Sequence, residues 1–163
     1  MKNLAKFTIF TLLAGMLSMA SLNSNAHCEI PCGIYGDSVR VALIKEHIAT
    51  VEKSMNMINE LSAQENPDYN QLVRWVVNKE EHAKKIQDIV SRYFLHQRIK
   101  LTGPENEAAY KKYQVQLELL HRVLVFAMKT KQSTDLNTIE KLKETVHEFE
   151  HIYFHKHDDG HSN

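Results

Sequence analysis

Apolar residues recur every three or four positions along four separate stretches of this chain, and this periodicity restricts the fold more than any other feature. Such spacing places the apolar side chains on one face of an α-helix. No stretch shows the alternation that is typical of a strand. In chain order, the four apolar stripes are Val41, Ile44, Ile48, Val51, Met55 and Ile58; Leu72, Val76, Ala83, Ile86, Val90 and Tyr93; Tyr110, Tyr113, Leu117, Leu120, Leu124 and Ala127; and Ile139, Leu142, Val146, Phe149 and Tyr153.

Residues that start or stop helices separate the four stretches. Asp37 or Ser38 is expected to cap the first helix, and residues 61–67 are expected to form the first loop. The second helix is predicted to run to about Ile99, and Pro104 suits the first turn of the third. Residues 133–135 offer the cap of the fourth. Short connections of this kind favour an all-α antiparallel four-helix bundle over residues 37–154.

The first 26 residues have the three parts of a secretory signal peptide. Lys2 and Lys6 precede an apolar run, and Ser24-Asn25-Ala26 ends the segment with small residues. The alternative is a membrane anchor, but the run is shorter than the roughly 20 residues that span a bilayer. We therefore expect signal peptidase to cleave after Ala26, and the product to be periplasmic or otherwise exported, with no stable membrane span.

The remaining composition excludes some partners. The chain has 163 residues, with 20 basic and 20 acidic side chains, which suits one domain with a single core. No basic patch rich in aromatic residues is present, so nucleic acid is not an expected partner. The ten histidines all follow the predicted signal peptide.

Both cysteines lie close together just after the predicted cleavage position. In an exported protein Cys28 and Cys32 would ordinarily form a disulfide. Here the closed loop would be very small, so it would restrict the unfolded chain little. Metal ligation or redox chemistry explains their spacing better than stability does.

Cleavage after Ala26 would leave His27 as the first residue, with a free amine beside Cys28. The amine and the Cys28 amide nitrogen can close one five-membered ring around a metal ion, and that nitrogen and the Cys28 sulfur can close another. Cys32 can add a second sulfur, and the imidazole of His27 can approach along the axis. A nitrogen–sulfur plane favours nickel or copper over tetrahedral zinc. Residues 27–36 are therefore predicted to form a metal-binding hook.

A second group of possible ligands lies at the end of the chain. His147, His151 and His155 are four residues apart and would share a face while the helix lasts. The His-rich segment 155–163 follows. Such a tract can bind nickel, copper or zinc loosely, and the alternative is a solvated helix end.

The nine residues from His27 to Tyr35 read His-Cys-Glu-Ile-Pro-Cys-Gly-Ile-Tyr. This segment resembles the start of the mature chain in the nickel-containing superoxide dismutases. The resemblance implies a four-helix bundle that assembles as a homohexamer, with one nickel ion per subunit. It also implies conversion of superoxide to oxygen and hydrogen peroxide, as nickel cycles between Ni(II) and Ni(III).

By this resemblance the metal ligands are His27, Cys28 and Cys32. Tyr35 is expected near the open face of the metal, where it helps to place substrate or water. Glu29 is expected beside the same access route. One departure concerns the axial imidazole, which some members brace with a glutamate and an arginine. At those positions this chain has Ala42 and His82, so either His82 or a neighbour, Glu46 or Glu81, replaces the brace, or the axial bond is looser.

Two other functions fit parts of the sequence. A periplasmic nickel or copper carrier would use the hook and the histidine tail and would show no turnover. A helical oligomer with a Cys28–Cys32 redox switch would need neither His27 nor a free amine. Apolar residues off the main stripes also favour assembly over a monomer; these are Leu43, Val73, Val77 and Leu119.

Overall fold

The computed structural model describes residues 36–154, and all of its regular structure is helical within that range. Four long α-helices follow one another, and a π-helix continues the second. Their bounds are α2, Asp37–Ser62; α3, Tyr69–Asp88; η1, Ile89–Arg98; α4, Glu107–Gln132; and α5, Leu136–Phe154. The prediction of an all-α four-helix bundle is confirmed.

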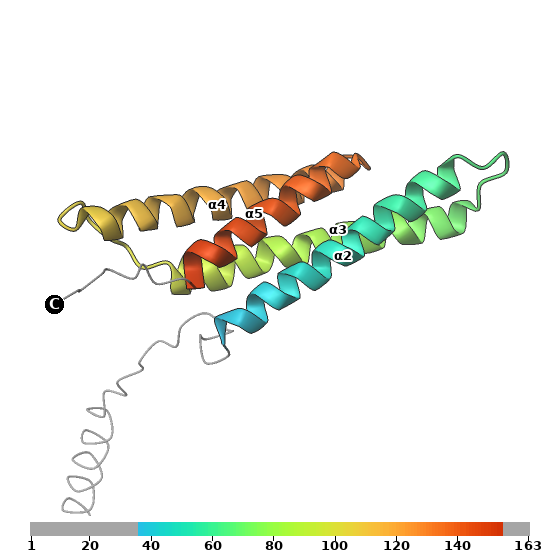
Figure 1. Cartoon of the computed structure of the whole chain (residues 1–163). Helices are drawn as coiled ribbons and strands as arrows, with labels where there is room; N and C mark the ends of the chain where they lie inside the picture. The colour runs from blue at the N-terminus through green and yellow to red at the C-terminus, as the bar shows by residue number, and fades with distance from the viewer. Residues whose placement is uncertain (1–35, 155–163) are drawn as a thin grey trace, which may run out of the picture.

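The helices form two antiparallel hairpins, α2 with α3 and α4 with α5, that pack side by side (Figure 1). The α3 helix also contacts α4, so each helix lies beside its neighbours in the sequence. Contacts between α2 and α5 complete the bundle. As a result, the start of α2, the end of η1 and the end of α5 meet at one end of the bundle (Figure 1).

The first and fourth predicted stripes lie almost entirely in the core, but the second and third were right only in part. On α4 the buried residues of the third stripe are Leu120 and Ala127, whereas Tyr110, Tyr113 and Leu117 are partly exposed. Every residue of the first stripe is buried, as are Ala83, Ile86 and Val90 of the second. Phe94 lies at the centre of an aromatic group, with its ring edge-on to those of Tyr93, Phe149 and Tyr153 at centroid distances of 5.2, 5.0 and 5.5 Å. Edge-to-face pairs of this kind add to the stabilisation from burial of apolar area.

Three of the helix boundaries differ from the predictions. The α2 helix continues to Ser62, so the first loop begins two residues later than expected. Pro104 lies in the turn before α4 rather than in its first turn, because Asn106 caps that helix by accepting a hydrogen bond from the Ala109 amide at 3.0 Å. Neither Asp37 nor Ser38 caps α2, since Gly36 occupies that position without a side-chain hydrogen bond. The predicted cap of α5 is confirmed, because Asp135 accepts from the Asn137 amide at 3.0 Å.

The second helix changes its hydrogen-bond pattern near its end. From Ile89 to Arg98 it is a π-helix, and the Ile99 amide still donates to the Phe94 carbonyl at 2.9 Å. A π-helix joins residues five positions apart, whereas an α-helix joins residues four apart. Side chains such as Tyr93 and Arg98, which would diverge in an α-helix, are thereby brought toward the same side.

The apolar residues that lie off the predicted stripes differ in how far they are exposed. Val73 and Val77 are 58% and 57% exposed, as expected for residues that favour assembly. Leu119 is only 1% exposed and belongs to the core, so its prediction as an exposed residue was wrong. It lies beside Leu120 on a helix whose buried face is wider than one stripe. Between residues 36 and 154, the structure contains no helix of sufficient length and apolarity to cross a bilayer.

Candidate functional site

The predicted metal ligands His27, Cys28 and Cys32 lie outside the described residues, as do Glu29 and Tyr35. The predicted signal peptide and the tail from 155 onward lie outside them too. The structure does show where the hook joins the bundle. Gly36 precedes the first turn of α2, so the hook is attached to the bundle end where α2, η1 and α5 meet.

Asp37, the first residue of α2, is the centre of a polar cluster at this attachment point. Its carboxylate accepts hydrogen bonds from the Tyr93 hydroxyl at 2.5 Å and from the Tyr153 hydroxyl at 2.7 Å. It also pairs with the Arg98 guanidinium at 2.8 Å. Its side chain is 15% exposed. Donors from η1 and α5 therefore fix the residue that follows the hook, two positions after Tyr35.

The electrostatics of this cluster favour an ionised Asp37. Burial on its own would raise the pKa of the carboxyl, but the hydrogen bonds from Arg98, Tyr93 and Tyr153 outweigh it and lower the pKa below the ordinary 3.8. Burial and the bond to this carboxylate raise the pKa of Tyr153 to about 12. Asp37 is therefore a carboxylate, and both tyrosines are protonated donors, at neutral pH.

Two arginines add positive charge at the same end. The Arg40 guanidinium lies over the Tyr93 ring, 5.0 Å from its centroid. The Nε atoms of Arg40 and Arg98 are buried and have no hydrogen-bond partner among residues 36–154. A buried donor without an acceptor is costly, so an acceptor from the hook would stabilise this end of the bundle. A hook with two thiolates and a carboxylate offers such acceptors, and its nitrogen and sulfur donors fit nickel.

The structure places the residues considered for the axial brace. Ala42 is exposed on α2, and His82 lies on α3. The Nδ1 atom of His82 is 3.2 Å from the Nδ1 atom of His47 on α2. Burial lowers the pKa of both rings, and the ammonium of Lys85 lowers it further, so both rings are neutral at pH 7. Glu46 and Glu81 are exposed beside this pair. The sequence interpretation included His82 but missed its partner, His47.

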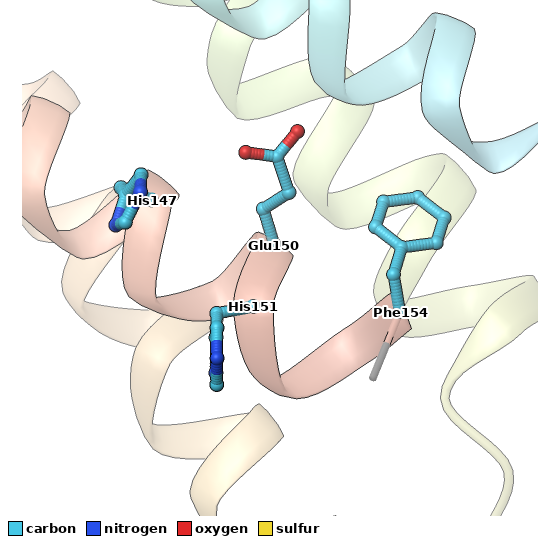
Figure 2. A pocket seen from close by; sticks show the side chains of 4 residues that line it. All are labelled: His147, Glu150, His151 and Phe154. Atoms are coloured by element: carbon cyan, nitrogen blue, oxygen red, sulfur yellow. The ribbon is translucent and has the colours of Figure 1, made fainter. Parts of the chain in front are cut away.

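The C-terminal histidines do not form a metal site within the described residues. His147 and His151 project from successive turns of α5 and line a shallow pocket with Glu150 and Phe154 (Figure 2). The two imidazoles do not converge on one point (Figure 2). Across residues 36–154, no group of three or more histidine, cysteine or acidic side chains is arranged to bind a metal. His155 lies outside the described range.

Sequence reasoning also missed the Asp37 cluster. Asp37 was interpreted as a helix cap, and Tyr93 and Tyr153 as core residues. One signal was present in the sequence, because a buried tyrosine hydroxyl needs a hydrogen-bond partner and an acidic residue begins the adjoining helix. Asp37 could not be assigned as that partner from the sequence, because the π-helix brings Tyr93 and Arg98 to the same side.

Comparison with known proteins agrees with the four-helix fold. A sequence model described as nickel-containing superoxide dismutase matches residues 22–157, a range that includes the whole hook and all four helices. Searches of curated proteins and of solved structures each found no significant match. With an all-α four-helix bundle and a family match over most of its length, this chain belongs to the nickel-containing superoxide dismutases, oxidoreductases that act on superoxide.

Proposed function

We propose that the active protein begins at His27, after cleavage behind Ala26, and that the new chain start binds the nickel ion. The ligands are the amine and imidazole of His27, the amide nitrogen and thiolate of Cys28, and the thiolate of Cys32. When bound, nickel supplies a Ni(II)/Ni(III) couple that oxidises one superoxide and reduces the next. The observation that carries this proposal is the family match, which covers every one of these positions.

The other residues of the hook serve the substrate. We assign Tyr35 to hold substrate or water by a hydrogen bond from its hydroxyl, and Glu29 to the access route beside it. Superoxide is an anion, and Arg40 places positive charge at the bundle end to which the hook is attached, whereas the charge of Arg98 is balanced by Asp37. Such charge raises the local concentration of an anionic substrate.

The Asp37 cluster supports a defined position for the hook. A ligand set on a chain terminus binds well only if the chain is held where it leaves the fold. Three hydrogen bonds from two helices hold Asp37, two residues after Tyr35. This attachment limits the volume that the hook can sample.

We further propose a homohexamer with one nickel ion per subunit in the periplasm or another exported location. Tyr69, Val73 and Val77 support assembly, because they are four residues apart on α3 and are 72%, 58% and 57% exposed. The predicted signal peptide supports export. Light scattering would measure the assembly, and a mass other than that of six chains would contradict the hexamer.

The first test examines the exported protein as the cell makes it. N-terminal sequencing should find His27 as the first residue, elemental analysis should find about one nickel per chain, and the protein should remove superoxide. Cys28→Ser and Cys32→Ser should each lose nickel and turnover. Cys28→Ser with full nickel content would contradict the proposed ligand set.

A second variant separates the enzyme from a metal carrier. His27→Gln keeps the amine, the amide nitrogen and both thiolates, so it should retain nickel and turn over superoxide more slowly. His121→Gln is a matched control, because His121 is exposed on α4 within the bundle. If the protein binds nickel reversibly and shows no turnover with His27 intact, it is a carrier and the proposed catalytic function is wrong.

A further inference from the structure

The His47–His82 pair has a geometry suited to more than a hydrogen bond. The two Nδ1 atoms are 3.2 Å apart, and the rings are nearly perpendicular, with centroids 5.0 Å apart and an interplanar angle of 79°. The pair links α2 to α3, which lie side by side along the bundle (Figure 1). Both rings are partly exposed, so ions from solvent can reach them.

The separation of the nitrogens matches two ligands of one metal ion. Imidazole nitrogens bind transition ions at about 2.0–2.1 Å. From that bond length, two nitrogens lie roughly 2.9 Å apart at a right angle and roughly 3.3 Å apart at a tetrahedral angle. The distance of 3.2 Å between His47 and His82 lies between these limits. The spacing of the two helices therefore already suits both rings as ligands of one ion.

The surroundings provide carboxylates and one competing cation. Glu46 and Glu81 directly precede the two histidines in the sequence, and the negative charge of each carboxylate favours the protonated form of His82. Glu81 pairs with Lys85 at 2.8 Å. The positive charge of the Lys85 ammonium disfavours a further positive charge at both rings. Among residues 36–154 the two imidazoles are the only protein ligands in place, so water completes the coordination sphere and the ion exchanges readily.

We propose that His47 and His82 form a second metal site, an exchangeable one for a divalent ion of the first transition row that prefers imidazole, such as Ni²⁺. Neither ligand belongs to the hook, and the proposed site requires neither cleavage after Ala26 nor catalysis. We expect the bound ion to stay divalent, since the pair contributes no thiolate to stabilise a higher oxidation state.

The test uses the full chain with Cys28→Ser and Cys32→Ser, which removes the thiol ligands of the hook. NiCl2 is added to protein with ¹⁵N-labelled histidine, and ring nitrogen signals are followed by NMR while equilibrium dialysis counts bound ions. The His47 and His82 signals should shift or broaden together at the lowest nickel concentrations. If these two signals respond only after those of the other histidines, the proposal is wrong.

Variants identify the ligands without breaking the fold. His82→Gln keeps a hydrogen-bonding side chain for His47 but is a poor nickel ligand, so it should bind one ion fewer per chain with an unchanged circular dichroism spectrum. The matched control His121→Gln should bind the same number as the parent. Lys85→Gln removes a competing charge and should tighten binding. Equal nickel binding by His82→Gln and the parent would show that the pair is an interhelical hydrogen bond only.

Discussion

Replacement of Asp37 by asparagine tests the attachment of the hook to the bundle. Asparagine has nearly the same shape, but it loses the negative charge and exchanges one acceptor oxygen for a donor group. The lost charge-assisted bond to Arg98 costs about 1.5–3 kcal/mol, and a buried tyrosine hydroxyl without its acceptor costs about 1–3 kcal/mol. Because Arg98 is 36% exposed and can be hydrated, we expect a total loss of about 2–4 kcal/mol in the free energy of unfolding.

Urea denaturation followed by far-ultraviolet circular dichroism measures this loss. The midpoint should fall while the slope stays constant, because the surface exposed on unfolding is unchanged. Asp88→Asn is the control, since Asp88 pairs with Lys84 at 2.9 Å on the exposed side of α3 and should lose less than about 0.5 kcal/mol. If Asp37→Asn is no more destabilising than Asp88→Asn, the cluster does not hold the start of α2.

The same variant has a defined pH dependence. The pKa of Asp37 is lowered in the folded state, so in acid the unfolded chain binds a proton more readily than the folded chain does. The stabilisation is complete above about pH 4 and is lost as the pH falls through the folded pKa. The difference in stability between the wild type and Asp37→Asn should therefore shrink in acid. A difference that grows as the pH falls would contradict an ionised Asp37.

Three further predictions follow from the packing. Phe94→Ala should lose about 3–5 kcal/mol, because the ring is fully buried against Phe149 and its neighbours, and a loss below about 1 kcal/mol in urea denaturation would contradict that packing. Lys143→Gln should lose no more than about 1 kcal/mol, since its pair with Glu52 at 2.6 Å is over 30% exposed on both sides; the loss should decrease in high salt, and a salt-independent loss would contradict an exposed ion pair. Ultraviolet titration should find Tyr153 ionising near pH 12, and the late component should be smaller in Tyr153→Phe, where Tyr93 still contributes to it; an unchanged titration curve would contradict the assignment.

The bundle was predictable because the helix period determines which residues are buried. The positions of the first stripe, from Val41 to Ile58, follow from spacing alone, and each one is buried. Tertiary contacts decided the exceptions. Leu119 is off the predicted stripe but is buried, because two neighbouring helices cover a wider face of α4 than one stripe provides.

The cluster at the hook attachment was not predictable to the same degree. A period of 3.6 residues cannot indicate a π-helix, and without it Tyr93 and Arg98 lie on different sides of the helix. Asp37 has the residue type and position of a helix cap, so local rules assigned it that role. Its three partners come from residues 56 to 116 positions later in the chain, and sequence spacing gives no information about such contacts.

The hook was recognised for a different reason. Its ligands are consecutive in the sequence, so their chemistry can be worked out from a few bonds without knowledge of the fold. The brace of the axial imidazole involves separate helices, and the sequence could suggest only candidates for it. The pairing of His82 with His47 became visible only when α2 and α3 were placed side by side.

The free amine of His27 is the central claim, and one added residue tests it most directly. A chain that starts with an extra glycine before His27 keeps both thiolates and the imidazole, but it moves the amine away from the position that closes the first ring with the Cys28 amide. We predict that this chain keeps its helical circular dichroism spectrum and loses superoxide turnover, while the chain that starts at His27 is active. Full turnover by the extended chain would show that the amine is not a nickel ligand and would contradict the account.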